Sequence, residues 1–358
     1  MKYLLNLTVI VISWISISCA TYSVNSSQRQ LANALKDNDL QFLPSCQYSK
    51  EATHHGLLDV NTLNEASGLA VSKQYNHLYH INDSDADSAL IVSDLNGQNL
   101  KKIKVKHTRF IDAEDLSYGE CFENEYCLIV ADIGVLRGNR SNGDRALYFF
   151  IESHLYDKNQ MPVDEIEPDL ILPLSLPFKD SVDAESFAIH PKTKDLFILT
   201  KHYDLKKKEA YEHHLLKIPF KAYSAFTPGS LLFTGIKPEV VASFDLKKIY
   251  PDQKEQREYG DWVWQVPTSM DIHPDGKKFI VLNYMTAIEF FFDLSEDNNL
   301  LDTSWDEGKN YQVIPLEYQP VQEAIAYNLE GDGFYYTSEF SKRFPKKLPE
   351  LLSYKCRQ

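Results

Sequence analysis

A short acidic motif recurs along the chain and carries the side chains best suited to chemistry. It reads as a small or acidic residue, Ala or Pro, Glu, a small residue and an apolar pair, as in Asp183–Ala188. Thr replaces Glu in one copy, so the five positions are Glu65, Glu114, Glu185, Thr268 and Glu323. Carboxylates brought together away from water must be protonated, pair with a cation or bind a metal, because like charges oppose ionisation.

Each copy leads through a turn into a second apolar run that ends in polar residues. Oxygen ligands from Glu, Asp and Asn suit Ca²⁺, and Mg²⁺ less well. We therefore predict a calcium site with ligands drawn from Glu65, Asn82, Glu114, Asp132, Glu185, Asn283 and Glu323. The alternative is structural. In that case the Glu residues cap backbone amides and align the repeats, and Lys201 is the internal counter-charge.

Further side chains close to these positions suit the binding of a ligand. We predict that the substrate-binding residues are Thr268, Lys201, Trp264 and Tyr284. Aromatic rings such as these two could line a sugar or lipid pocket, and buried packing explains them equally well.

Weaker signals are assigned to structure or to solvent. The spacing Asp83-x-Asp85-x-Asp87 resembles the start of an EF-hand loop, but the required Gly is missing, so a solvated acidic loop is expected. Arg137, Arg140 and Arg145 fall on one predicted mouth loop; a solvated loop is expected, and contact with an anionic ligand is the alternative. His190 and His273 each precede Pro in a predicted turn, where a structural role is expected.

The elements that must position these residues repeat with the motif. Each copy begins a first strand-like run and is followed by a tight turn and two further runs. Four of the five copies also have a fourth strand-like run. Repeated four-stranded units are the signature of a β-propeller. We predict an all-β, five-bladed propeller, with six blades as the alternative. The missing fourth strand is expected from the N-terminal side, between Leu43 and Val60, where it would close the ring.

The repeated Glu would open the innermost strand of each blade and face one mouth of the central channel. Loops between second and third strands and loops between blades emerge at that mouth. The long loops are predicted there, at 83–88, 133–145, 201–213, 247–265 and 339–349. A concentration of long loops on one face indicates that the functional site lies on that face.

Cysteine spacing supports ring closure in an oxidising compartment. Cys46 and Cys356 flank the folded region, and we predict a disulfide between them that staples the closing strand. Free or separately paired thiols are the alternative. Cys121 and Cys127 bracket a short loop and are predicted to form a second disulfide.

The N-terminus predicts export. Residues 1–19 read as a signal peptide of lipoprotein type with lipidation at Cys19, and cleavage after Ala20 is the alternative. Residues 20–45 form a polar tether, and 46–356 form a single propeller domain. We expect a monomer in the bacterial outer membrane or periplasm, touching the membrane only through its lipid anchor.

The net charge of −14 excludes a general nucleic-acid binder, which needs a basic face.

Five short motifs resemble exported bacterial β-propellers of the SdiA-regulated and phytase-like esterase families, which are NHL-like. The motifs are Glu65–Ala70, Ile81–Ser84, Ala113–Leu116, Ala131–Gly134 and Asp183–Phe187. The resemblance implies a five-bladed propeller with a calcium site, and some relatives are calcium-dependent lactonases and esterases. It implies as site residues Glu65, Asn82, Glu114, Asp132 and Glu185.

Two functions fit these features. The first is a calcium-binding scaffold on the cell envelope that holds a small molecule, glycan or protein at the channel mouth. The second is a calcium-dependent hydrolase of lactones or esters, in which the metal polarises a carbonyl and a ring carboxylate is the general base. The nearest His residues are His202, His213 and His214, on a predicted loop, and no channel His is evident. The binding function is therefore favoured.

Overall fold

The computed structural model describes residues 46–83, 87–122, 124–135, 140–204, 206–207, 209–230, 232, 234–250, 262–296 and 305–357. The predicted signal peptide, the lipidation site Cys19, the tether 20–45 and Arg137 lie outside these residues. Across the described part of the chain, no helix has the length and apolar character needed to cross a membrane.

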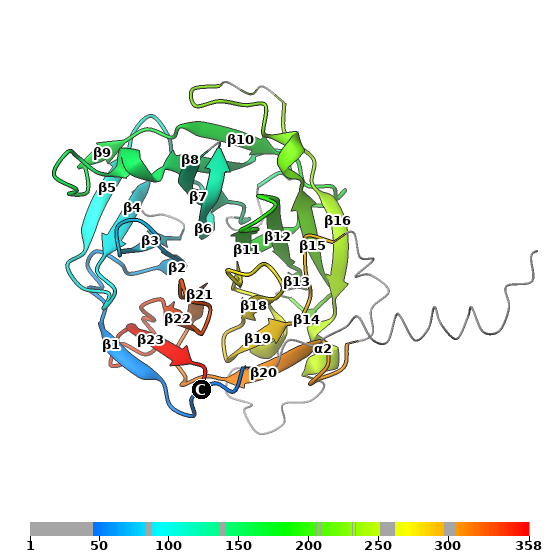
Figure 1. Ribbon diagram of the computed structural model, residues 1–358. Helices are drawn as coiled ribbons and strands as arrows, with labels where there is room; N and C mark the ends of the chain where they lie inside the picture. The colour runs from blue at the N-terminus through cyan, green and yellow to red at the C-terminus, as the bar shows by residue number, and fades with distance from the viewer. Residues whose placement is uncertain are drawn as a thin grey trace, which may run out of the picture. The chain divides into compact units, whose positions relative to one another are not determined.

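Five four-stranded antiparallel units lie around a ring and form a five-bladed β-propeller (Figure 1). Blade I holds β2 (Ala66–Val71), β3 (Leu78–Asn82), β4 (Ala89–Ser93) and β5 (Lys101–Val105); blade II holds β6 (Ala113–Phe122), β7 (Glu125–Asp132), β8 (Arg145–Ile151) and β10 (Leu170–Leu174). Blade III holds β11 (Asp183–Ile189), β12 (Leu196–Lys201), β15 (His213–Ile218) and β16 (Glu239–Phe244); blade IV holds β17 (Ser269–Ile272), β18 (Phe279–Leu282), β19 (Thr286–Phe290) and β20 (Tyr311–Pro315). Blade V holds β21 (Gln322–Tyr327), β22 (Gly333–Ser338), β23 (Glu350–Lys355) and β1 (Thr53–Leu57). The five-bladed prediction is confirmed, and the six-bladed alternative is wrong.

Burial along the strands explains why the repeats form this ring. Every residue of β2 and of β21 is buried, because an inner strand is covered by the neighbouring blades on both faces. The outer strand β5 alternates instead, with Ile103 and Val105 buried between exposed lysines. All five apolar clusters combine side chains from two adjacent blades, and so join blade to blade.

The N-terminal strand closes the ring as predicted. β1 pairs antiparallel with β23, and a disulfide joins Cys46 to Cys356 with a Cα–Cα distance of 5.4 Å. Tyr48 secures the same closure, because its hydroxyl donates to Glu289 Oε1 in blade IV at 2.8 Å. The second predicted disulfide, Cys121–Cys127, is also present and spans the turn between β6 and β7.

Side chains of one inner strand form hydrogen bonds with the inner strands of other blades. Asp115 Oδ2 accepts from Phe187 N at 2.9 Å in blade III and from Ser269 Oγ at 3.1 Å in blade IV. Asp271 Oδ2 accepts from Tyr327 N at 2.8 Å in blade V. These carboxylates accept hydrogen bonds from backbone amides that have no partner in a neighbouring strand. They therefore fix the inner strands around the axis.

The two turn histidines are structural, as expected. His190 Nε2 lies 3.2 Å from the Gly276 carbonyl oxygen, and His273 Nε2 lies 2.8 Å from that of Gly331. In both cases a turn in one blade contacts the turn of the next blade along the chain. A Cβ on either glycine would collide with the imidazole ring.

Long connections are not confined to the face with the repeated Glu, which corrects one expectation. The links from β8 to β10, from β15 to β16 and from β19 to β20 are also long, and they emerge on the opposite face. The first of these carries β9 (Glu165–Ile166), which adds a parallel fifth strand to blade I beside β5. Loop length therefore does not indicate which face carries the functional site. That face has to be identified from its side chains.

Candidate functional site

The repeated Glu residues occupy β-bulges at the start of inner strands. In β6 the pairing passes from Ala113 to Asp115 and leaves out Glu114. The same irregularity leaves out Glu185 in β11 and Glu323 in β21. A bulge releases one residue from the ladder and redirects its side chain. Three blades thus present a carboxylate at one mouth of the channel.

Blades I and IV differ from this pattern. In β2 the bulge falls at Ser67, between Ala66 and Gly68, so Ser67 takes the position that Glu holds elsewhere. Glu65 lies two residues earlier; burial raises the pKa of Glu339 well above its usual range, and the charges of Glu323, Asp83 and Glu65 raise it further. In blade IV, Thr268 Oγ1 donates to the backbone oxygen of Gln322 at 2.9 Å.

Two groups of three carboxylates share Glu114. Within each group, ligand oxygens lie within 4.8 Å of one another; the groups are Asp83, Asp112 and Glu114, and Glu114, Asp183 and Glu185. We call these five residues the acidic centre. Glu114 and Glu185 were predicted as ligands, whereas Asp83, Asp112 and Asp183 were not. The signal for two of the missed residues is the repeated triplet Asp-Ala-Glu at 112–114 and 183–185.

The acidic centre opposes its own ionisation. Burial raises the pKa of Glu114 well above its usual range, and the charges of Glu185, Asp83, Asp183 and Asp112 raise it further. Burial and the charge of Asp183 raise the pKa of Asp112 to about 6. A divalent cation would remove this penalty, because it stabilises the ionised carboxylates.

Gly134 forms one wall of the acidic centre. A Cβ at this position would lie 1.9 Å from Glu114 Oε1 and 2.5 Å from Asp112 Oδ2. Its amide donates to the Asp112 backbone oxygen at 3.1 Å. The carboxylates therefore pack directly on the backbone after β7, and a side chain at 134 would displace them.

Lys201 already supplies a counter-charge to one member of the acidic centre, Glu185. Lys201 Nζ lies 2.8 Å from Glu185 Oε1 and donates to the Tyr284 hydroxyl at 3.0 Å. That hydroxyl donates to Glu323 Oε1 at 2.9 Å. Glu323 is thus joined to Lys201 through Tyr284, and it belongs to neither carboxylate group.

Three predicted ligands use their oxygens to hold loops. Asn82 Oδ1 accepts from Glu65 N at 3.1 Å, and Asn283 Oδ1 accepts from Thr286 N at 2.7 Å. Asp132 Oδ1 accepts from Asp112 N at 2.9 Å. Asp132 thereby positions Asp112 of the acidic centre and Asn82 positions Glu65, whereas Asn283 holds the turn before β19.

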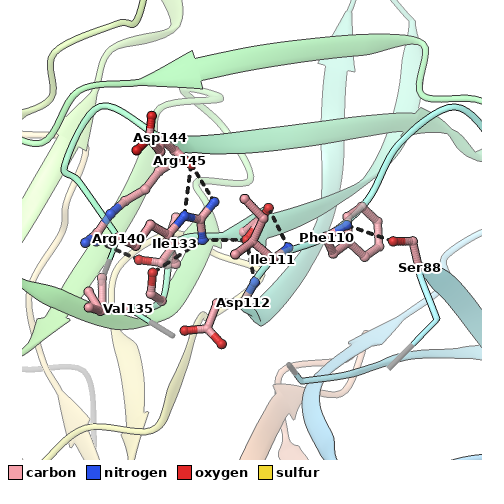
Figure 2. Close-up of polar contacts among 12 residues, drawn as sticks. Ser88, Phe110, Ile111, Asp112, Ile133, Val135, Arg140, Asp144 and Arg145 are labelled. Atoms are coloured by element: carbon pink, nitrogen blue, oxygen red, sulfur yellow. Dashed lines mark hydrogen bonds and ion pairs between the residues drawn. The ribbon is translucent and has the colours of Figure 1, made fainter. Parts of the chain in front are cut away.

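The expectation that Arg140 and Arg145 lie on a solvated loop is wrong, because both are buried. Arg140 Nη1 contacts Asp132 Oδ1 at 2.6 Å, and Arg145 Nη1 donates to the Ile133 carbonyl at 2.6 Å (Figure 2). Burial lowers the pKa of Arg145 to about 10. The two guanidinium groups clamp the segment that carries Gly134 against the end of β7.

An apolar cavity of about 210 Å³ lies on the same face between blades IV and V. Its lining includes Val263, Tyr284, Met285, Tyr318 and Phe344. Tyr284 thus belongs both to this cavity and to the chain of contacts from Lys201 to Glu323. Trp264, the other predicted aromatic, packs instead against the apolar cluster of blades III and IV.

Two of the nearby histidines are engaged elsewhere. His213 Nδ1 accepts from His202 N at 3.1 Å, and its Nε2 lies 2.7 Å from the Gln265 carbonyl oxygen. Burial lowers the pKa of His213 to about 4. His214 Nδ1 lies 2.9 Å from Ser243 Oγ. His213 and His214 are therefore engaged, whereas the ring of His202 is exposed and contacts Tyr211, so the candidates for a general base are the carboxylates and His202.

No family model matches the chain, and no curated protein matches it, so the SdiA-regulated and phytase-like resemblance is not confirmed. The structure is similar to a gluconolactonase from Xanthomonas campestris, at 12% identity over 82% of this chain and 72% of that one, with a TM-score of 0.40. It is similar to a luciferin-regenerating enzyme at 9% identity, over 86% of this chain and 95% of that one, with a TM-score of 0.40. A chain of the nidogen/laminin complex gives 10% identity, 77% and 73% coverage, and a TM-score of 0.40. Because the sequence identities are 9–12% and the TM-scores are 0.40, these similarities do not indicate an activity for this chain.

Proposed function

We propose that this protein is an exported, lipid-anchored β-propeller that binds calcium at the acidic centre and holds a ligand at the same channel mouth. The observation that carries the proposal is the sharing of Glu114 by two carboxylate groups. Carboxylate oxygens are the ligands that Ca²⁺ takes, at about 2.3–2.6 Å and in flexible geometry. The residues that would hold the ion are Asp83, Asp112, Glu114, Asp183 and Glu185.

The proposed setting is the cell envelope. Lipidation at Cys19 and the tether 20–45 would hold the propeller at a membrane surface in the bacterial outer membrane or periplasm. Two disulfides are typical of proteins in oxidising compartments, which agrees with export. In this function the metal stiffens the mouth, and a small molecule, glycan or protein binds against it.

A calcium-dependent lactonase or esterase is the second candidate. The apolar cavity beside Tyr284 favours it, because an acyl chain or ring could lie there next to the acidic groups. Calcium held by the acidic centre would supply Lewis-acid polarisation of a carbonyl. A carboxylate at the mouth would be the general base, since His213 and His214 are engaged elsewhere.

Thermal unfolding with and without calcium tests the binding proposal. A ligand present at 100 times its Kd stabilises the folded state by about 2.7 kcal/mol. We expect calcium to raise the melting temperature by several degrees, and Glu114→Gln to abolish the rise. Glu323→Gln is the matched control, because Glu323 lies outside both carboxylate groups, and it should keep the response.

The absence of any calcium-dependent shift in the wild type would refute the metal site. The hydrolase candidate is tested separately with a panel of lactones and aryl esters, each measured with calcium and with chelator. Calcium-dependent turnover that Glu114→Gln removes would favour the enzyme. A calcium-dependent melting shift without turnover would leave the binding function.

A further inference from the structure

A second cavity opens on the propeller axis at the face opposite the acidic centre. Its volume is about 240 Å³, which is below the roughly 300–1,000 Å³ of pockets for drug-sized ligands. All five blades contribute to its lining, at the ends of their inner strands. The residues used below are Lys73, Glu120, Tyr126, Asp271, Tyr327 and Leu329.

One carboxylate in this cavity is held in a fixed orientation. Asp271 Oδ1 accepts from Ile272 N at 2.8 Å, and its Oδ2 accepts from Tyr327 N at 2.8 Å. Among the residues that the structure describes, no cation forms an ion pair with Asp271. Burial raises the pKa of Asp271 to about 7. A positive charge brought into the cavity would stabilise the ionised form.

The other two charged residues of the lining already have partners. Glu120 pairs with Lys194, with Oε1 and Nζ 2.5 Å apart. Lys73 is exposed, and its Nζ donates to the Tyr126 hydroxyl at 3.0 Å. This leaves Asp271 as the group that a ligand charge would meet.

The remaining walls are apolar or aromatic. Leu69, Ile189 and Ile272 form part of the lining, together with the rings of Tyr118 and Tyr126. The Tyr126 ring already contacts Lys73 and Tyr118, so the apolar walls contribute mainly by favouring a hydrocarbon body. A neutral or anionic ligand of the same size would supply no counter-charge to the Asp271 carboxylate, whose ionised form is disfavoured by burial.

We propose that this axial cavity binds a small primary amine, with the ammonium group against Asp271 and the hydrocarbon part against the apolar walls. The site is distinct from the acidic centre, since its lining residues come from the opposite ends of the inner strands. It does not depend on calcium binding at the other face.

Binding of n-butylamine to the mature protein, measured by calorimetry and by saturation-transfer NMR, tests this site. 1-Butanol and butyrate are controls of the same chain length. We expect the amine to bind at least ten-fold more tightly than either control. Asp271→Asn should weaken amine binding at least ten-fold, and Glu114→Gln should leave it unchanged.

Lys73→Met gives a test in the opposite direction. Removing the positive charge at the rim should tighten amine binding several-fold, because the repulsion between like charges is lost. Lys73 is exposed, so this variant remains informative even if Asp271→Asn does not fold. Equal affinity for amine and alcohol, retained affinity in a folded Asp271→Asn, or unchanged affinity in Lys73→Met would each overturn the proposal.

Discussion

At the scale of single residues, Gly134 determines how closely the backbone after β7 approaches the acidic centre. The sequence marks this glycine only as part of the motif Ala131–Gly134, and its role appears once the fold brings Glu114 against it. The role of Asp83 is likewise not apparent from the sequence, because the spacing of Asp83, Asp85 and Asp87 suggests a solvated loop. Only the arrangement of blades reveals that its carboxylate meets those of Asp112 and Glu114.

Gly134→Ala should disable the calcium site. The added Cβ would lie 1.9 Å from Glu114 Oε1, so the carboxylate must move. We expect calcium affinity to fall at least ten-fold in a calorimetric titration, with a loss of about 1–3 kcal/mol in unfolding free energy. Gly143→Ala is the matched control, because the nearest atom to its added Cβ is 3.9 Å away. Equal calcium affinity in both variants would contradict the placement of Glu114.

The raised pKa values predict an unusual pH profile for the metal-free protein. The pKa of Asp112 rises on folding from 3.8 to about 6, so its stabilising contribution is complete below the unfolded value and is lost as the pH increases through about 6. The pKa of Glu114 is shifted in the same direction. With chelator present, we expect the melting temperature to fall between about pH 4 and pH 6.

Calcium should flatten this decline, because metal binding requires deprotonated carboxylates and strengthens as the pH rises. Asp112→Asn should remove part of the decline in chelator. A melting temperature that increases over the same interval in chelator would show that the acidic centre does not carry buried, mutually repelling carboxylates.

At the scale of elements, the repeated motif was sufficient to predict the strands, because each inner strand is a short apolar run that follows the same pattern of small residues and Glu within this chain. The register of β2 was not predictable, since Glu65 continues the sequence pattern while the bulge falls at Ser67. Burial of Arg140 was also missed. An arginine in a polar segment looks solvated unless its partner on another strand, here Asp132, is known.

Arg140→Ala should destabilise the segment between β7 and β8. The variant leaves Asp132, which is fully buried, without its ion-pair partner. Breaking a buried pair in this way costs about 3–5 kcal/mol. Urea unfolding measures the loss, and Lys101→Ala, which removes an exposed pair with Asp164, should cost at most about 1 kcal/mol. Similar losses in both variants would contradict the clamping role of Arg140.

At the scale of the whole molecule, ring closure follows from the missing fourth strand and the two terminal cysteines, and both were readable from the sequence. The long connections on the opposite face follow from strand order as well, because each of them joins the third strand of a blade to its fourth. The five-bladed ring brings residues 112–114 and 183–185 together at one mouth. It also forms the axial cavity at the other end.

The two disulfides should differ in their effect on stability. The chain-entropy relation gives about 6 kcal/mol for the Cys46–Cys356 link, whose sequence separation is 310, and about 2 kcal/mol for Cys121–Cys127, whose separation is 6. Chemical unfolding of the two double Cys→Ala variants measures the difference. A larger loss from the Cys121–Cys127 variant would show that the ring is held by the strand pairing of β1 rather than by the terminal disulfide.

The most direct test of the central claim is an anomalous-difference map from a crystal of the protein grown with calcium. The account predicts a peak at the channel mouth with a carboxylate oxygen of Glu114 within about 2.3–2.6 Å. Oxygens of Asp83, Asp112, Asp183 or Glu185 should complete the coordination. A map without a peak beside Glu114, in a crystal where these carboxylates are well ordered, would contradict the account.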